Sequence, residues 1–355
     1  MSAKSDYQPE NNDAGMKERK ASDNAPSVAS NADEQYKQQM SKGVVKGEFV
    51  RSPTSFRDWI RADGSTKFAP EANRYHLIVS YACPWASRAL FLRAFKGLED
   101  VIDVTVVDWL LPSTGWRFTD KVEGCNFPSF APEMKQLRDL YDQSSDGEFE
   151  GRVTVPVLYD TKEKVIVNNE SSELIRMLNS EFNAFATKNK AVDFYPSDLA
   201  EKIDQVNAWV YPQVNNGVYR CGFARSQQAY DQAVEEHHQG INRLEKLLSK
   251  QRYLASNDRI TEADVRLFVT LVRMDSVYAI HFKTSCRLQD FPNLLNYTRE
   301  LYQLPGIAST VNMEHIKHHY YESHTSLNPE AIVARAWDID FNAPHNRDTQ
   351  KFDSK

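Results

Sequence analysis

Cysteine is scarce in this sequence. Its 355 residues include only four cysteines, at positions 83, 125, 221 and 286. They are too few and too widely spaced for a disulfide framework or for a zinc site of the CxxC type. The distribution instead fits a reducing compartment, where thiols stay free and one of them can be reactive.

Long apolar runs are also missing. No stretch approaches the roughly 20 apolar residues that cross a bilayer, and the first thirty residues lack the apolar run of a secretory signal. Asp6, Glu10, Asp13 and Glu18 break the acid-poor pattern of a mitochondrial transit peptide. We therefore expect a cytoplasmic protein with no membrane partner.

Neither sign of charge dominates. The 43 basic and 49 acidic residues are interspersed and give a net charge of -6, so the sequence carries no basic surface of the kind that neutralises phosphates. Nucleic acid is not an expected partner. A hydrophobic content of 41% is enough for a sizeable core.

The composition changes along the chain and divides it into four expected segments. Residues 1–45 are polar and nearly free of large apolar side chains, which is typical of a disordered arm. We then expect a domain of mixed strands and helices over 46–190, a helical domain over 191–325 and a C-terminal tail over 326–355.

The first of these domains shows an alternating strand and helix pattern. Residues 75–81 predict a strand, 84–96 a helix that ends at Gly97, and 101–109 a second strand joined by a parallel crossover. Residues 110–150 are polar and predict an irregular stretch. Two strands, 153–159 and 164–167, then predict a hairpin, and residues 171–182 predict a helix. This β-α-β, β-β-α order is the thioredoxin fold.

From Pro196 onward the periodicity is helical and strand signals vanish. The expected helices are 199–215, 227–250, 262–280, 293–303 and 312–322. Thr261 and Asp264 have the spacing of a capping box before the third of these. The fold class is therefore α/β plus all-α, a thioredoxin-like domain followed by a helical one.

Cys83 is the candidate nucleophile. It lies at the end of a strand and directly before a helix, where free N–H groups and the helix dipole favour the thiolate, so we predict a lowered pKa. An inert buried cysteine is the alternative. Ala86 occupies the CxxC position of a second thiol, so an external thiol such as glutathione must resolve a mixed disulfide on Cys83.

Two further segments predict a thiol-peptide site. Val155-Pro156 stands where thioredoxin-like proteins keep a cis proline, and Val155 is expected to pair with the cysteinyl part of glutathione; a trans proline at a strand start is the alternative. Glu170-Ser171 opens a helix that can receive both charges of a γ-glutamyl group, although an ordinary helix cap uses the same groups.

Several segments together resemble the Xi-class glutathione transferases, also called glutathionyl-hydroquinone reductases, over residues 46–330. The segments are Tyr81-Ala82-Cys83-Pro84-Trp85, Gly115-Trp116-Arg117-Phe118, Thr154-Val155-Pro156-Val157, Asn169-Glu170-Ser171 and Asn215-Asn216-Gly217-Val218-Tyr219. The resemblance implies a reaction in which Cys83 takes glutathione from an S-glutathionyl-hydroquinone, and a second glutathione releases it as the disulfide.

The resemblance also implies roles for individual residues. Trp116 is expected to lie over glutathione, and Tyr219 and Tyr320 to line the hydroquinone side. Arg152 and Val155 are expected to hold the backbone and carboxylate of glutathione, and Glu170 with Ser171 its γ-glutamyl end. A homodimer is implied as well. The chain departs from the class at Ser87, where histidine is usual, and in the tail near residues 328–331.

Other functions remain open. An omega-like thiol transferase that acts on dehydroascorbate or on glutathionylated proteins needs the same cysteine and the same glutathione site. A non-catalytic, ligand-binding relative needs the fold without the nucleophile. His318 and His319 lack a matching acidic or cysteine partner, so no metal is expected.

Overall fold

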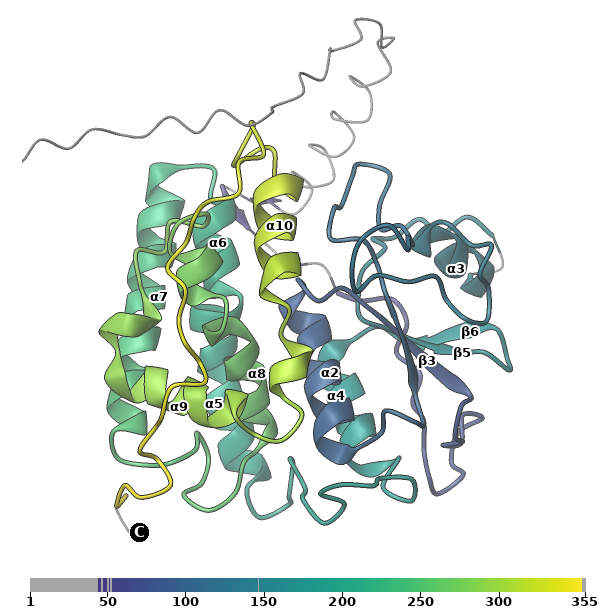
Figure 1. Ribbon diagram of the computed structural model, residues 1–355, viewed down its shortest axis with the longest axis horizontal. Coiled ribbons are helices and arrows are strands. Elements are labelled where there is room, and N and C mark those ends of the chain that lie inside the picture. Colours follow the sequence, from purple (N-terminus) through teal and green to yellow (C-terminus); the bar gives the residue numbers. More distant parts are fainter. Residues whose placement is uncertain (1–43, 46, 50, 52, 146, 353–355) are drawn as a thin grey trace, which may run out of the picture.

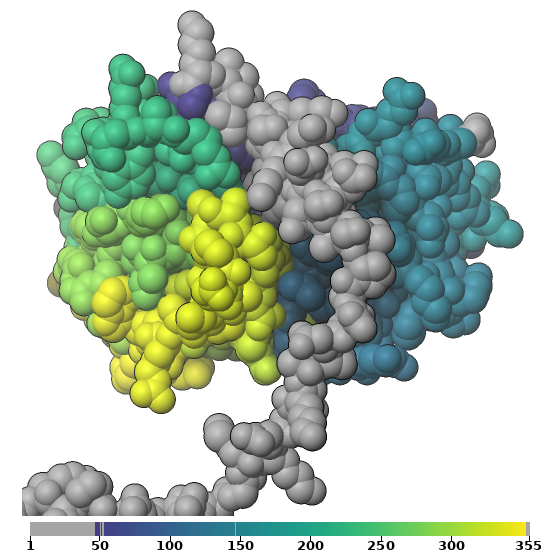
Figure 2. Space-filling model, turned by 90° about the horizontal axis from the view of Figure 1, so that it is seen from above, coloured from purple at the N-terminus to yellow at the C-terminus, as the bar shows by residue number. Residues whose placement is uncertain are grey.

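The computed structural model describes residues 44–45, 47–49, 51, 53–145 and 147–352. The predicted disordered arm, residues 1–45, therefore lies outside the described residues except at Val44–Val45. These two residues form strand β1, which pairs with β2 (Glu48–Phe49). A sheet-containing part and a helical part lie side by side (Figure 1). Seen from above, they form two adjoining lobes (Figure 2).

The sheet of the first part has the predicted topology. Its strands β3 (Tyr75–Val79), β4 (Asp103–Val106), β5 (Val157–Asp160) and β6 (Val165–Asn168) lie in the order β4-β3-β5-β6. The pair β3 and β4 is parallel, and β5 and β6 form an antiparallel hairpin, as the sequence predicts. All five residues of β3 are buried, because the sheet carries helices on one face and the loop and helix of residues 107–144 on the other.

Helices α2 (Pro84–Lys96) and α4 (Ser171–Ser180) pack together between the sheet and the helical part (Figure 1). The boundaries of α2 are those predicted, with Pro84 at its first position and Gly97 ending it at a φ of 65°, a conformation that glycine adopts without strain. Helix α4 begins directly after Glu170, whose carboxylate caps it.

The predicted irregular stretch 110–150 is wrong in part, because it contains α3 (Leu137–Ser144). This helix has only two turns, and its buried residues Leu137, Leu140 and Tyr141 are too few to show a helical period in the sequence. A capping box between Gln136 and Asp139 starts it.

The second part is helical. It contains α5 (Ala200–Val210), α6 (Gly217–Phe223), α7 (Gln227–Leu248), α8 (Glu262–Leu271), α9 (Pro292–Tyr302) and α10 (Met313–Ser323). The sequence places an interruption where α6 lies, because Gly217 and Gly222 are poor helix formers. Packing explains them: a Cβ on Gly222 would lie 2.3 Å from the Phe282 ring, so only glycine lets the two segments approach.

The start of α8 confirms the predicted capping box. Asp264 accepts hydrogen bonds from the Thr261 N–H at 2.8 Å, from the Leu254 N–H at 2.8 Å and from the Tyr297 hydroxyl at 2.7 Å. One buried carboxylate therefore ties α8 to the preceding loop and to α9. Among the helices described, none has the length and apolar character needed to cross a membrane.

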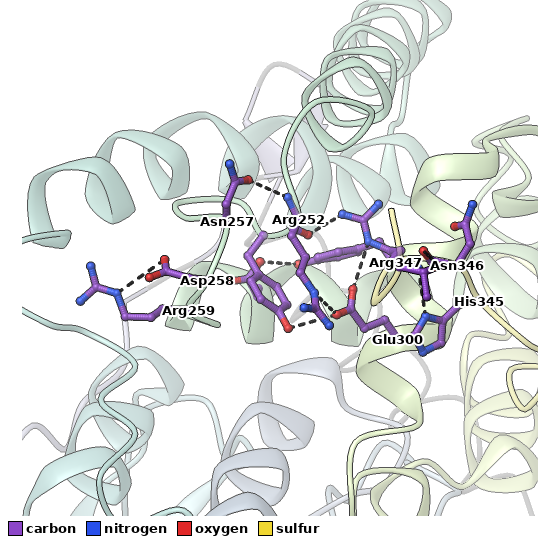
Figure 3. Close-up of polar contacts among 12 residues, drawn as sticks. Arg252, Asn257, Asp258, Arg259, Glu300, His345, Asn346 and Arg347 are labelled. Carbon is purple, nitrogen blue, oxygen red and sulfur yellow. Dashed lines mark hydrogen bonds and ion pairs between the residues drawn. The ribbon is translucent and has the colours of Figure 1, made fainter. Parts of the chain in front are cut away.

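The C-terminal tail runs along the helical part (Figure 1) and is anchored near its end. Figure 3 shows Arg347, whose buried guanidinium donates to Glu300 at 3.1 Å. Glu300 also accepts from Arg252 at 2.6 Å and from the Tyr253 hydroxyl at 3.1 Å. Residues 248–253, α9 and the tail thus share one charged cluster.

Candidate active site

Cys83 is the N-cap residue of α2. The residue as a whole is half-buried, and its thiol donates to the Val155 carbonyl at 3.5 Å. The peptide bond between Val155 and Pro156 is cis, as predicted. The sheet thus brings the end of β3 and the segment before β5 together around one sulfur atom.

The expected lowered pKa of Cys83 is wrong for this structure. Burial raises the pKa of the thiol, while the N–H groups of Ala86 and Trp85 and the charges of Arg273 and Arg51 oppose the rise. The helix-terminus effect is therefore present, but the loss of solvent around the sulfur outweighs it.

A first cavity of about 380 Å³ opens beside Cys83. Five of the residues predicted for glutathione line it: Arg152, Val155, Pro156, Glu170 and Ser171. A cavity of this size suits a small peptide ligand. The structure therefore brings together segments that are separated by the whole of β5 and β6.

The start of α4 supplies polar groups to this cavity. The Glu170 carboxylate accepts from the Ser172 N–H at 3.0 Å and from the Thr54 hydroxyl at 3.2 Å. Glu170 therefore caps the helix, which is the alternative expected from the sequence. Its side chain also lines the cavity, where it can accept from a ligand ammonium.

A second cavity of about 170 Å³ adjoins the first and shares Arg51, Gly151 and Arg152 with it. Its aromatic wall is formed by Phe49, Tyr219 and Phe223. This wall suits a flat ring.

Three tyrosine hydroxyls form a chain behind this wall. The Tyr219 and Tyr320 hydroxyl oxygens are 2.6 Å apart, and the Tyr320 and Tyr278 oxygens are 3.0 Å apart. Burial raises the pKa of each, so all three remain protonated at neutral pH. Tyr219 and Cys83 lie close enough for each charge to affect the other, since a Cys83 thiolate contributes to the raised pKa of Tyr219.

Not every predicted residue faces a cavity. Trp116 is buried, stacks on His319 with ring centroids 5.3 Å apart, and is absent from the described lining of both cavities. Tyr320 is buried and reaches the second cavity only through Tyr219. His318 bonds to Glu322, and no cluster among the described side chains is arranged to hold a metal ion.

Three residues near the cavities are absent from the sequence predictions. Arg51 lies over Trp85 and Tyr219, with its guanidinium carbon 4.8 and 5.0 Å from their ring centroids. Arg88 is buried on α2, and Tyr278 ends the hydroxyl chain. Only Arg88 had a local signal, because it lies five residues after Cys83 on the same helix.

Comparison with known proteins identifies the family of this fold. A family profile described as the N-terminal domain of glutathione S-transferase matches residues 82–181, and one described as its C-terminal domain matches residues 227–300. Glutathionyl-hydroquinone reductase YqjG of Escherichia coli is 47% identical over 86% of this chain and 93% of its own length. The omega-like glutathione S-transferase 2 of Schizosaccharomyces pombe is 45% identical over 81% and 92%.

Solved structures agree. The Xi-class transferase from Natrialba magadii superposes with a TM-score of 0.82 at 48% identity, covering 88% of this chain and 94% of that one. The glutathione-bound structure of YqjG gives 0.79 at 46% identity, covering 86% and 98%. The fold is thus that of a glutathione transferase. Within that fold, the chain belongs to the Xi class, the family of the glutathionyl-hydroquinone reductases.

Proposed function

We propose that this chain is a glutathione-dependent reductase of S-glutathionyl-hydroquinones. The observation that carries the proposal is the contact of the Cys83 thiol with Val155, which lines a peptide-sized cavity, together with an adjoining aromatic cavity that has Tyr219 in its wall. A substrate that joins glutathione to a hydroquinone ring through sulfur fits this arrangement, because its sulfur comes to lie where the two cavities meet.

The first half-reaction breaks the bond between sulfur and the ring. The Cys83 thiolate attacks the glutathionyl sulfur, and a Cys83–glutathione disulfide forms. The electron pair of the sulfur–carbon bond leaves with the ring carbon, which takes up a proton to give the hydroquinone. Tyr219 donates a hydrogen bond to the phenolic oxygen while negative charge develops there.

The second half-reaction restores the cysteine. A second glutathione thiolate attacks the mixed disulfide, releasing oxidised glutathione and the Cys83 thiolate. In forming the disulfide, the two glutathione sulfurs together lose two electrons, and the ring gains them. The reaction therefore needs no reductant other than glutathione. Ala86 occupies the position where a CxxC motif would have its second cysteine, which agrees with the need for an external thiol.

The site residues divide between the two parts of the substrate. Val155 pairs with the cysteinyl backbone beside Pro156, Arg152 takes a glutathione carboxylate, and Glu170 with Ser171 takes the γ-glutamyl end. Trp116 stacks on His319 and lines neither cavity, and its position over glutathione stays a prediction.

The same proposal includes the setting of the enzyme. It acts in the cytoplasm as a homodimer, and its chain divides into a polar arm (1–45), a glutathione-binding domain (46–190), a helical domain (191–325) and a tail (326–355). Free thiols at all four cysteines support the compartment.

Turnover of a glutathionyl-menadiol tests the function directly. Wild-type protein is expected to release menadiol in the presence of glutathione and to carry one glutathione on Cys83 in intact mass spectra, whereas Cys83→Ser does neither. A wild-type protein that binds glutathione but leaves the adduct intact would refute the proposal.

A thiol transferase is the second candidate, favoured by the omega-like name of the S. pombe relative. Such an enzyme uses the same cysteine and the first cavity but has no need of the tyrosine chain. Faster turnover of dehydroascorbate than of the glutathionyl-hydroquinone would select it.

A further inference from the structure

Arg88 is a buried cation at the inner wall of the first cavity. Only 2% of its surface is exposed, and its guanidinium carbon lies 4.5 Å from the Trp85 ring centroid. Its Nη1 donates to the Ser171 hydroxyl oxygen at 3.3 Å. Its Nε and Nη2 are buried and have no hydrogen-bond partner within the part of the chain that the structure describes.

No carboxylate among the described residues forms an ion pair with Arg88. Glu262 is engaged by Arg176 at 2.9 Å and by Arg266 at 2.9 Å. Glu170 lies nearer the cavity but accepts from Ser172 and Thr54. Burial and the like charge of Arg266 lower the pKa of Arg88 to about 9. A buried cation left in this way is costly, and an anion that enters the cavity relieves the cost.

We propose that Arg88 is the charge partner of the γ-glutamyl α-carboxylate of glutathione, acting through Ser171 as a positioning residue. A guanidinium has donors only, so the Ser171 oxygen must accept from Arg88. Its own proton is then left to donate to the ligand carboxylate. Glu170, one residue away, accepts from the ligand ammonium, and the two side chains together match the zwitterionic end of an α-amino acid.

This inference deepens the proposed function and rests on one part of it, that glutathione occupies the first cavity. It is independent of the hydroquinone chemistry, because it concerns only the end of the ligand that is farthest from the reacting sulfur. Binding measurements therefore test it without turnover.

Three S-methylated peptides separate the two charges of the ligand. S-methylglutathione has both the α-carboxylate and the α-amine of the γ-glutamyl residue. Glutaryl-Cys(SMe)-Gly keeps this α-carboxylate and lacks the amine, and 4-aminobutyryl-Cys(SMe)-Gly keeps the amine and lacks the α-carboxylate. Their dissociation constants are measured by calorimetry for wild type, Arg88→Gln and Arg93→Gln. Arg93 is the matched control, because it lies on the same helix and binds the Ile102 and Glu99 carbonyls away from the cavity.

Arg88→Gln is expected to weaken the binding of the two peptides that keep the γ-glutamyl α-carboxylate by about 10- to 100-fold, the effect of losing a charge-assisted contact. It should change the binding of the third peptide less than about 3-fold. Arg93→Gln should leave all three unchanged. Equal weakening of all three peptides by Arg88→Gln would mean a structural role and overturn the inference.

If Arg88→Gln does not fold, Arg88→Lys replaces it. The lysine keeps the charge but reaches less far. It should therefore weaken the binding of only the two peptides that keep the α-carboxylate, by a smaller factor than Arg88→Gln does. A lysine variant that weakens the binding of all three peptides equally overturns the inference. Selective weakening without hydroquinone turnover would uphold Arg88 and refute the proposed activity, so the two failures are distinguishable.

Discussion

The hydroxyl chain of Tyr278, Tyr320 and Tyr219 makes the most specific prediction about catalysis. Each hydroxyl has one proton, and two protons are used between the three oxygens, at 3.0 and 2.6 Å. Tyr278 and Tyr320 are 0% and 1% exposed, whereas Tyr219 lines the second cavity. When Tyr278 donates to Tyr320 and Tyr320 to Tyr219, the remaining proton belongs to Tyr219 and points to the cavity.

The expected loss differs along this chain. Tyr219→Phe removes a donor that is already oriented toward the developing phenolate, which is worth about 2.7–4 kcal/mol, or roughly 100- to 1,000-fold in kcat. Tyr320→Phe leaves that donor in place but removes the hydrogen bond between Tyr320 and Tyr219 that orients it. At about 1 kcal/mol for this bond, we expect roughly a 5-fold loss of kcat, and the loss of the second bond, to Tyr278, also lowers the free energy of unfolding.

The assay compares two reactions of the same cysteine. One is turnover of a glutathionyl-hydroquinone, and the other is exchange between glutathione and hydroxyethyl disulfide, whose leaving group is a thiolate that needs no phenol donor. Tyr219→Phe should slow turnover of the glutathionyl-hydroquinone and leave the rate of disulfide exchange within about 3-fold. The reason is that the Tyr219 hydroxyl stabilises only the negative charge that it contacts, which is on the phenolic oxygen. Equal loss in both reactions, or full hydroquinone turnover by Tyr219→Phe, would refute the assignment.

Three further predictions follow from buried polar groups. Because burial raises the pKa of Cys83, its alkylation by iodoacetamide should reach half its maximal rate at a pH above that of an unstructured cysteine peptide; a midpoint below that of the peptide contradicts this. Burial lowers the pKa of His319 to about 4, so the neutral form stabilises the fold fully above the unfolded value of about 6.5 and stability falls as pH drops from there toward 4. Thermal unfolding against pH should show this slope, and His319→Gln should make it shallower without removing it, because burial also lowers the pKa of His76, His237, His281 and His324. Asp264→Ala should lower the free energy of unfolding by about 3–5 kcal/mol in urea titration, because it leaves the Thr261 and Leu254 N–H groups buried without an acceptor, whereas Tyr297→Phe should cost only about 1–2.

Local signals account for the elements that the sequence predicts well. Helix α2 has an initiating proline, an apolar face and a terminal glycine within fifteen residues, and the capping box of α8 spans only four. Helices α3 and α6 escape prediction for opposite reasons. The first is too short to show a period, and the second contains Gly222, whose role becomes clear only when Phe282 is seen to pack on it.

The site divides in the same way. Cys83, Pro156 and Glu170 stand at element boundaries that short motifs mark, so the sequence predicts them. Arg51 lines both cavities and Tyr278 joins the hydroxyl chain only through tertiary packing, and both come from segments with no motif. The pKa of Cys83 follows the same rule, since the helix terminus that lowers it is local and the burial that outweighs it is tertiary.

The helical part also fixes the geometry of the nucleophile. Arg273, just after α8, donates to the Tyr81 carbonyl at 2.9 Å, to the Ala82 carbonyl at 3.1 Å and to the Ser87 hydroxyl oxygen at 2.8 Å. The Ser87 hydroxyl in turn donates to the Cys83 carbonyl at 3.1 Å. Serine at position 87 serves both contacts, because a hydroxyl can accept from a guanidinium and donate to a carbonyl at the same time. The turn that holds the thiol is therefore clamped from both sides, and its position depends on the docking of the two parts as much as on the strand and helix that flank it.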